Sequence, residues 1–517
     1  MKARQLWWLL VLVALLGLTA CEREAPPEAW ATVHGPDRLP EDFAREGRLF
    51  VVFAPEGAEV PHVHMGFPPW SDSDPFFAMD VDGWRGEQPL RLMPGMTGFP
   101  RESLDGVPPG RYQLQAIYKT DFFFHQPVAE GSWVSEPLEV EWPEDRGKIE
   151  LRLGELLPDE LPADRPNLRF VRIRSELLSE FWGEDIHLRA AVILPSDWED
   201  SDARYPVRYN IGGYGSRYTR ALGLMEAGSD FRNDWYDPAN PKFLMVLLDG
   251  TGPFGDPYQI NSRNSGPWGD AVVEELIPHI ESKFRAIAEP EARFLDGGST
   301  GGWASLAMQI FYPETFNGAW SFCADSPDFR RFQLIDLYED DNAYYNRHGY
   351  LIPSKRSIEG DPEFSIKAEI AMERVMGRGD TFLTGGEQWG AWHALYGPRG
   401  DDGLPVPAWD EHTGEIDPEV VAYWKDYDLR LYLKENWPEI GEDLVGKLNI
   451  WMGDMDDYYL NPGMYRFAEL MAELSDPDPE ARFTWGRLQG HCWIPLSHAE
   501  IFRQMAERLE ASGAGGD

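Results

Sequence analysis

Strand-like and helix-like segments alternate along the chain from about residue 167 onward, and this alternation constrains the fold more than any other feature. Short apolar runs at 207–211 and 243–248 are strand candidates, and helix-like patterns occur between such runs. Alternation of this kind is typical of an α/β domain with a mostly parallel sheet. It stops near residue 325 and resumes near 446. We therefore expect one α/β core built from 167–324 and 446–517, with 325–445 as an insert or lid.

A different pattern precedes this core. Residues 47–153 contain short β-like runs broken by glycine and proline, for example at 49–53 and 112–118. The second of these runs follows a Pro-Pro-Gly turn and alternates in places, as a half-buried strand does. These features predict an all-β sandwich domain. Residues 154–166 are rich in proline and aspartate and are expected to form a linker.

The first twenty residues are expected to be a signal peptide. A basic start precedes an apolar run of thirteen residues, 6–18, which is short for a membrane span. The run ends in Leu-Thr-Ala-Cys, which resembles the bacterial lipobox, whose cysteine, here Cys21, is lipidated. An ordinary cleaved signal with a chance cysteine is the alternative. Lipidation would hold the protein outside the cytoplasm on a bacterial membrane, with 21–46 as a tether, and Glu22 favours the outer over the inner membrane.

The charge balance bears on possible partners. The chain has 47 Lys and Arg residues against 88 Asp and Glu residues, a formal net charge of −41. Such a surface repels phosphate backbones, so we expect no nucleic-acid partner.

His62 and His64 lie two residues apart without an evident third ligand, and we expect no metal and no other cofactor. Cys323 and Cys492 could pair in a disulfide or stay free, and the sequence leaves both possibilities open.

A glycine-rich hexapeptide, Gly-Gly-Ser-Thr-Gly-Gly at 297–302, lies between a strand candidate and a helix candidate. In this context Gly-x-Ser-x-Gly predicts a sharp turn that exposes a nucleophilic serine, here Ser299. The residues two before and two after the serine must then lack side chains. The N-terminus of the following helix favours developing negative charge. The alternative is a glycine-rich turn whose serine only caps the helix.

A serine nucleophile needs a base and an acid, and both are expected to follow it in this chain order. His491 lies in a loop after a strand candidate, whereas His498 lies near the start of the last helix, so we favour His491. Asp454, Asp456 and Asp457 all follow the strand candidate that begins near residue 448. Spacing alone does not decide which of them orients the histidine.

Six short motifs are distributed over the two parts of the expected core. They are Ile211-Gly212-Gly213-Tyr214-Gly215, Asp249-Gly250, Gly266-Pro267-Trp268-Gly269-Asp270, the Ser299 turn, Gly453-x-x-Asp456 and Gly490-His491-x-Trp493. In these motifs the chain resembles the putative-esterase family of α/β hydrolases, which includes feruloyl and acetylxylan esterases, S-formylglutathione hydrolases and enterobactin esterases. The resemblance covers about 170–323 and 447–511 and implies an α/β-hydrolase fold. In the family the acid commonly stands three residues after a strand-ending glycine, which implies Asp456. The large insert departs from the family, as does Asn210-Ile211, which stands where some relatives have His-Gly.

Further site residues follow from the chemistry of acyl transfer and from the resemblance. An alkoxide intermediate needs two backbone donors, and we expect the N–H of Thr300 and one from Gly213 or Tyr214. Trp268 and Trp392 are expected to contact the substrate. The aromatic residues of the insert could stack on a sugar or aryl group or form the core of a small helical subdomain, and the sequence leaves this open.

The expected function is that of a serine esterase. Ser299 would attack an ester carbonyl, His491 would carry the proton, Asp456 would hold the imidazole, and water would release the acyl-enzyme. The substrate would be a small-molecule or glycan-linked ester. A serine peptidase uses the same groups. A non-catalytic glycan-binding lipoprotein is a third possibility, which an intact set of serine, histidine and acid disfavours. The sequence does not predict the oligomeric state.

Overall fold

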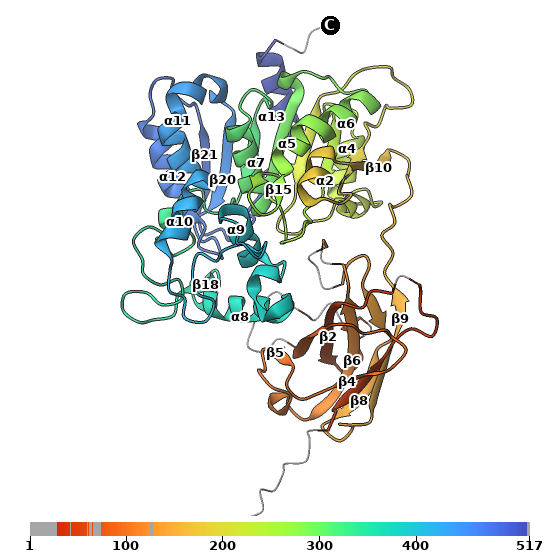
Figure 1. The fold of residues 1–517 in the computed structure, drawn as a ribbon. Helices are drawn as coiled ribbons and strands as arrows, with labels where there is room; N and C mark the ends of the chain where they lie inside the picture. The colour runs from red at the N-terminus through yellow and green to blue at the C-terminus, as the bar shows by residue number, and fades with distance from the viewer. Residues whose placement is uncertain are drawn as a thin grey trace, which may run out of the picture.

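The computed structural model of the 517-residue chain describes residues 28–513, except 42, 59, 62–64, 66–73, 122 and 125–127. The expected signal peptide, Cys21 and the pair His62 and His64 lie outside the described residues. Figure 1 shows an α/β domain above a β-rich domain, with the insert beside both. Within the described part of the chain, no helix combines the length and the apolar character that crossing a bilayer requires.

The α/β domain is built on an eight-stranded sheet with the order β10-β11-β13-β12-β16-β17-β20-β21. In this sheet β11 runs antiparallel to its neighbours, and every pairing from β13 to β21 is parallel. This arrangement confirms the expected α/β-hydrolase fold with a mostly parallel sheet. Parallel strands end at a common edge, which is where open α/β sheets bind ligands. The strands are β10 (Leu168–Arg174), β11 (His187–Ile193), β12 (Val207–Ile211), β13 (Leu244–Leu248), β16 (Arg293–Gly298), β17 (Ala319–Phe322), β20 (Leu448–Gly453) and β21 (Arg482–Gly486).

Helices cover both faces of this sheet because successive strand residues point to opposite sides. On β16, Leu295 packs in the apolar core that contains α7, whereas Phe294 packs in the core that contains α13. Both side chains are fully buried. The short strands β14 (Asn261–Ser262) and β15 (Gly266–Pro267) pair outside the main sheet. The helices are α2 (Glu176–Trp182), α3 (Ala221–Leu224), α4 (Asp230–Tyr236), α5 (Trp268–Asp270), α6 (Ile277–Lys283), α7 (Thr300–Phe311), α12 (Asn461–Glu473) and α13 (His498–Ala511).

The insert ends earlier than the expected boundary at residue 445. Helix α11 (Leu429–Leu444) packs against α7 and α12 and so belongs to the α/β domain. Its Leu433 lies in the main core, and the ring of Tyr432 lies 4.8 Å from that of Phe311 on α7. The helix was hard to recognise in the sequence because Pro438 lies inside it, and an internal proline usually signals a helix end.

The β-rich domain begins earlier than expected. Strand β1 (Ala31–His34) lies within the expected tether, 21–46, yet it pairs with β4 and with β9. Val33 and the neighbouring Trp30 are fully buried, and the Trp30 ring stacks 5.8 Å from that of Phe53 on β2. The sequence did not predict this strand, because it has only four residues and follows a polar segment.

The nine strands of this domain form one connected sheet whose two halves face each other across a shared apolar core. Strand β9 extends to Leu156, so the connection expected at 154–166 starts later than predicted. The other strands are β2 (Gly47–Pro55), β3 (Phe76–Val81), β4 (Leu90–Leu92), β5 (Thr97–Phe99), β6 (Gly110–Lys119), β7 (Trp133–Ser135), β8 (Leu138–Trp142) and β9 (Ile149–Leu156).

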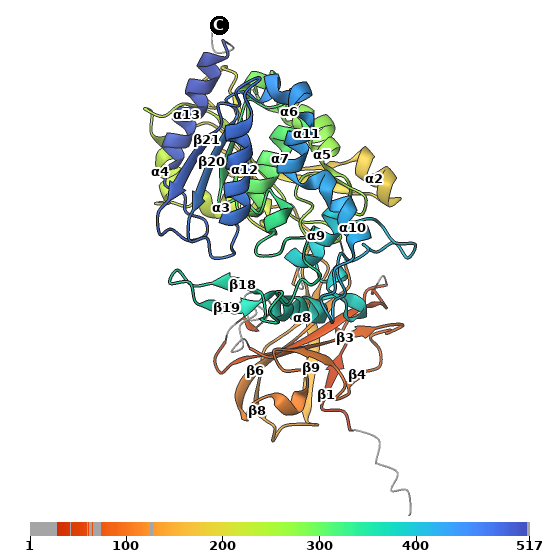
Figure 2. The same ribbon diagram turned by 90° about the vertical axis from the view of Figure 1, so that its left-hand side faces the viewer.

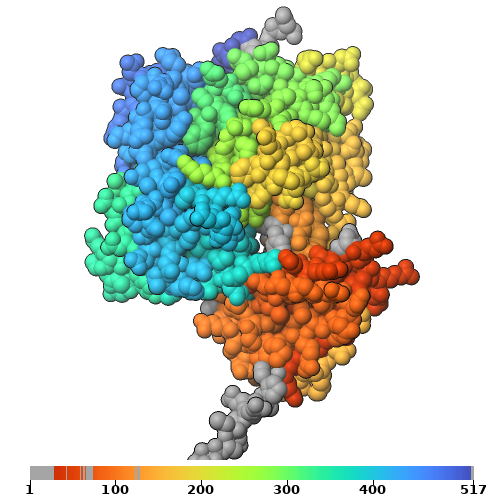
Figure 3. Space-filling view, viewed as in Figure 1, coloured from red at the N-terminus to blue at the C-terminus, as the bar shows by residue number. Residues whose placement is uncertain are grey.

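The insert lies between the two domains, as Figure 2 shows for α8 and the β18–β19 hairpin, and Figure 3 shows it in contact with the β-rich domain. Met372, Val375 and Met376 of α8 pack against the outer face of the β-rich sheet. The buried Arg48 of β2 donates to the Val375 carbonyl oxygen at 2.9 and 3.0 Å and to Asp380 at 2.7 Å. The insert elements are β18 (Pro353–Arg356), β19 (Pro362–Ser365), α8 (Ile366–Met376), α9 (Gln388–Tyr396) and α10 (Pro418–Trp424).

Candidate active site

Ser299 occupies the tight turn between β16 and α7. Its φ and ψ angles are 57° and −125°, a strained conformation that the surrounding structure must enforce. A Cβ atom on Gly297 would come within 2.4 Å of the Gly301 carbonyl oxygen, and one on Gly301 would come within 2.0 Å of the Ile211 carbonyl oxygen. Both positions therefore require glycine, as the Gly-x-Ser-x-Gly pattern predicts.

Three side chains from distant segments meet at this turn. Nε2 of His491 lies 2.9 Å from Oγ of Ser299, and Nδ1 of His491 lies 2.7 Å from Oδ2 of Asp456. The side chain of His491 is 13% exposed, whereas that of Asp456 is fully buried. The other oxygen of Asp456 accepts the backbone N–H of Tyr458 at 3.0 Å, which helps to hold the carboxylate in place. The arrangement can move a proton between the hydroxyl and the imidazole.

The neighbouring candidates occupy other positions. Asp454 accepts a backbone N–H of the loop after β21 at 2.6 Å, and Asp457 accepts the backbone N–H of His491 at 3.2 Å. Both aspartates therefore hold the loop that carries the histidine. His498 lies beside Arg208, and burial followed by the charge of Arg208 lowers its pKa to about 4.

The electrostatics of His491 reflect burial and two acidic neighbours. Burial disfavours the imidazolium, but the charge and hydrogen bond of Asp456, with a contribution from Cys492, raise the pKa of His491 well above its usual value. The hydrogen bond from Cys323 and the neighbouring imidazole lower the pKa of Cys492 to about 5. The neutral imidazole, which is the form that can accept a proton, therefore becomes populated only as the pH rises.

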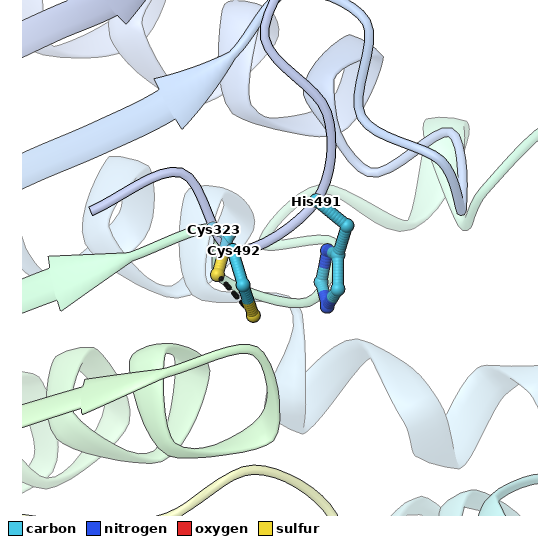
Figure 4. A group of neighbouring side chains, drawn as sticks. All are labelled: Cys323, His491 and Cys492. Atoms are coloured by element: carbon cyan, nitrogen blue, oxygen red, sulfur yellow. Dashed lines mark hydrogen bonds between the residues drawn. The ribbon is translucent and has the colours of Figure 1, made fainter. Parts of the chain in front are cut away.

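Cys323 and Cys492 are free thiols beside the histidine, with their sulfur atoms 2.9 Å apart (Figure 4). Cys323 is buried and its sulfur lies 3.3 Å from the backbone nitrogen of Ser299, whereas Cys492 is exposed. Among the described residues, these two and His491 form the one group whose ligand atoms, all within 4.8 Å of one another, could hold a metal ion. Both ring nitrogens of His491 already bond to Ser299 and Asp456, so a bound ion would compete with that arrangement.

The expected oxyanion donors lie around the serine. Thr300 is the first residue of α7, where backbone N–H groups have no acceptor within the helix. Gly213 lies against Ser299, because a Cβ atom on it would be 3.8 Å from the serine Cβ. Tyr214 lines the adjoining pocket, and its hydroxyl donates to the carbonyl oxygen of Gly386 in the insert at 2.7 Å. The loop after β12 can therefore bring its backbone close to a substrate.

A pocket of about 310 Å³ opens beside Ser299 and His491. Trp392 of α9 lines it. The expectation that Trp268 contacts the substrate is wrong, because this side chain is 3% exposed in the core and its indole N–H donates to the carbonyl oxygen of Ser265 at 2.9 Å. The full lining is Tyr214, Gly215, Ser299, Asp325, Gln333, Glu369, Met372, Glu373, Glu387, Gln388, Trp389, Trp392, Tyr458, Leu460 and His491.

The sequence analysis missed the acidic residues of this pocket. Two signals could have found some of them. Glu369 and Glu373 stand four residues apart on a helix, so they share one face. Asp325 follows the carboxyl end of β17, at the sheet edge where ligands bind. Oδ2 of Asp325 accepts hydrogen bonds at 2.9 to 3.3 Å from Tyr258, Gln388 and Thr300.

A larger hollow of about 640 Å³ lies between the β-rich and α/β domains. Its lining includes His187 and Arg189 but none of Ser299, His491 and Asp456. We therefore place the candidate active site at the smaller pocket.

Part of this chain is similar to known proteins. Residues 183–328 match the sequence model of the family described as putative esterase. Two curated proteins of Mycobacterium tuberculosis, one from strain CDC 1551 and one from strain H37Rv, are each named an esterase and are 27% identical to this chain over 178 residues. The alignment covers 33% of this chain and 35% of each relative, so the chain spans about a third of the length of the curated relatives that it matches.

Two solved structures align with this chain at low sequence identity. A ferulic acid esterase is 14% identical with a TM-score of 0.40, over 67% of this chain and 99% of that one. An S-formylglutathione hydrolase from Agrobacterium tumefaciens is 14% identical with a TM-score of 0.39, over 68% of this chain and 99% of that one.

Proposed function

We propose that the chain is a serine hydrolase of carboxylic esters, and the match of residues 183–328 to the putative-esterase sequence model supports this proposal. The observation that carries this proposal is the hydrogen-bonded series from Ser299 through His491 to Asp456, at 2.9 and 2.7 Å. The series stands at a strained turn between two obligatory glycines, which supports its assignment as a catalytic triad.

Each residue has a distinct role in the proposed reaction. Ser299 Oγ attacks the ester carbonyl while Nε2 of His491 takes its proton, and the imidazolium then protonates the leaving alcohol. Asp456 holds the imidazole in the required tautomer and stabilises its positive charge. Water, deprotonated by the same histidine, hydrolyses the acyl-enzyme and restores Ser299. This chemistry needs no cofactor.

The backbone stabilises the charge that develops on the carbonyl oxygen. The N–H of Thr300 lies at the start of α7, where the helix dipole adds positive potential. The second donor comes from the Gly213–Tyr214 loop. Loss of one such donor typically costs about a hundredfold to a thousandfold in turnover. A pocket of about 310 Å³ is at the small end of ligand sites and suits a compact acyl or alcohol group.

Burst kinetics with para-nitrophenyl esters test this proposal. We expect rapid release of nitrophenol followed by slower turnover, together with an acyl adduct in the intact-mass spectrum. The matched para-nitroanilide should be cleaved far more slowly, which distinguishes an esterase from a peptidase. Equal or faster cleavage of the anilide would favour the peptidase, and the absence of both a burst and turnover would reject hydrolysis.

We also propose that the protein acts outside the cytoplasm, anchored by a lipid on Cys21, more often at the outer than the inner membrane. The lipobox-like sequence before this cysteine and the following Glu22 support this proposal. Metabolic labelling with a fatty-acid analogue should label the wild-type protein and not Cys21→Ala. If the wild-type protein stays unlabelled, the proposal of a lipid anchor on Cys21 is wrong.

A further inference from the structure

The pocket beside Ser299 is strongly acidic. Among its described lining residues none is lysine or arginine, and the one group that can become positive is His491. Asp456 already pairs with that histidine. Four lining side chains carry a carboxyl group: Asp325, Glu369, Glu373 and Glu387.

Neutral donors hold three of these carboxyl groups. Glu373 accepts the backbone N–H groups of Trp389 and Gly390, both at 2.9 Å, at the start of α9. Glu369 accepts the indole N–H of Trp389 at 2.8 Å, and Asp325 accepts hydrogen bonds from neutral side chains. None of these donors carries the positive charge that would compensate an ionised carboxylate, and an uncompensated buried charge is costly.

Glu387 lacks even this support. It stands at the N-cap of α9, but its side chain makes no capping hydrogen bond. The basic group that acts on it most strongly is Lys119 of β6, in the β-rich domain, and Lys119 does not line the pocket. Burial lowers the pKa of Lys119 itself to about 8, so this lysine begins to lose its charge just above neutral pH.

Aromatic side chains line the same space. Trp392 is 3% exposed, and its indole Nε1 has no hydrogen-bond partner among the described residues. Trp389, Tyr214 and Tyr458 also line the pocket. The faces of such rings attract cations, and they do so most strongly where water is excluded.

We propose that this pocket binds an organic cation, so that the substrate is an ester whose acyl or alcohol part carries an ammonium group. This inference rests on the proposed ester hydrolysis and names its substrate class. Carboxylates supply the charge complement, with Glu387 as the one that has no hydrogen bond to its own helix, and the rings supply the apolar contact. Primary and quaternary ammonium groups share this chemistry.

The titration behaviour of the lining acids agrees with this proposal. Burial raises the pKa of Glu387 and of Glu369 to about 7 and that of Asp325 to about 6. An ammonium group bound beside them favours their ionised forms. Cation binding near neutral pH should therefore release protons, and the released amount should fall as the pH rises above these pKa values.

Isosteric esters that differ only in charge test the proposal. On the acyl side, the para-nitrophenyl ester of γ-trimethylammoniobutyrate is compared with the ester in which a tert-butyl group replaces the trimethylammonium group. On the alcohol side, acetylthiocholine is compared with its tert-butyl isostere. We expect kcat/KM for at least one cationic ester to exceed that of its neutral isostere by about tenfold or more. Butylammonium and butyltrimethylammonium, used as competitive inhibitors, distinguish primary from quaternary recognition.

The variant Glu387→Gln keeps the shape of the side chain and removes its charge. We expect the ratio of kcat/KM between the cationic and neutral esters to fall toward one. Glu359→Gln is the matched control, because Glu359 stands in the exposed turn between β18 and β19 of the same insert. This control should keep the wild-type ratio. Labelling by a fluorophosphonate checks that each variant is folded.

The outcomes separate this inference from the proposed function. If neutral esters are hydrolysed and both cationic esters react no faster, the cation site is wrong and the esterase stands. An unchanged ratio in Glu387→Gln also overturns the site. If no ester reacts, the proposed function fails, and calorimetry with butyltrimethylammonium then decides the site alone: binding with proton release supports it, and no binding rejects it.

Discussion

The parallel-sheet core and the insert contribute to the candidate site in different ways. In the core, Ser299, Asp456 and His491 each stand shortly after the carboxyl end of a strand, and two hydrogen bonds of 2.9 and 2.7 Å join them. In the insert, Glu387 at the N-cap of α9 and Trp392 within α9 line the same pocket of about 310 Å³. In the proposed reaction, short loops on a rigid sheet would therefore supply the chemistry, and the insert would determine what can bind.

The β-rich domain contacts both the insert and the α/β domain, but none of its described residues lines the pocket beside Ser299. Arg48 binds the last turn of α8 through the Val375 carbonyl oxygen. A second link joins Glu130 to Arg217, at 2.9 and 3.0 Å, and Arg217 follows the oxyanion loop and also bonds to Asp249 at 2.7 Å. Substitutions of Ser299, Asp456 or His491 should therefore reduce turnover. Substitutions of pocket residues in the insert should alter selectivity, and substitutions at the two links of the β-rich domain should alter stability.

The largest effect is expected from Ser299→Ala. Loss of the nucleophile should lower turnover of a para-nitrophenyl ester by about a millionfold. Ser282→Ala is a matched control, because Ser282 is an exposed residue of α6 whose hydroxyl only donates to a carbonyl oxygen of the same helix. Steady-state kinetics should give wild-type turnover for the control. Residual turnover of Ser299→Ala close to that of the wild type would place the nucleophile elsewhere.

The next largest effect separates the three aspartates after β20. Asp456→Asn should lower turnover by about ten-thousandfold, because the amide no longer fixes the histidine tautomer. Asp454→Asn and Asp457→Asn should cost much less, since those carboxylates accept backbone N–H groups of the histidine loop. Parallel measurements of kcat for the three variants rank them, and a larger loss for Asp454 or Asp457 would contradict the assignment.

A smaller effect concerns the link between the β-rich domain and the insert. Arg48→Met should lower the free energy of unfolding by about 2 kcal/mol, because charged hydrogen bonds to Val375 and Asp380 are lost. Urea denaturation followed by tryptophan fluorescence measures this change. Arg111→Met, which removes a 55% exposed arginine from surface ion pairs of the same domain, should leave the transition in place. If both variants lower the free energy of unfolding equally, the contacts of Arg48 with the insert do not contribute to stability beyond those of a surface arginine.

The smallest expected effect is on pH dependence. Imidazolium cannot accept the serine proton, so kcat/KM should rise with pH as His491, whose pKa is raised, loses its proton. Cys492 contributes to that raised pKa, so Cys492→Ser should move the acid limb to lower pH. pH–rate profiles recorded in the presence of a thiol reductant measure the shift. A movement to higher pH would contradict the proposed interaction.

The fold and the meeting of Ser299 with His491 could be predicted because local sequence carries their signals. A glycine pattern marks the Ser299 turn, and position after a strand marks His491. The pocket could not be predicted in the same way. Glu387 comes close to Ser299 only because the irregular insert packs between two domains, and short-range patterns do not encode such contacts. Trp268 was predicted to contact the substrate because it lies in a motif, but a motif does not show which way a side chain points, and Trp268 lies in the core.

The account depends most directly on one serine in the core being the nucleophile. The most direct measurement is peptide mapping by mass spectrometry after the full chain reacts with a fluorophosphonate. The account predicts a single major adduct on Ser299, which is absent from Ser299→Ala and strongly reduced in His491→Ala, because the histidine activates the hydroxyl. An adduct on another serine, or undiminished labelling of Ser299→Ala, would contradict it.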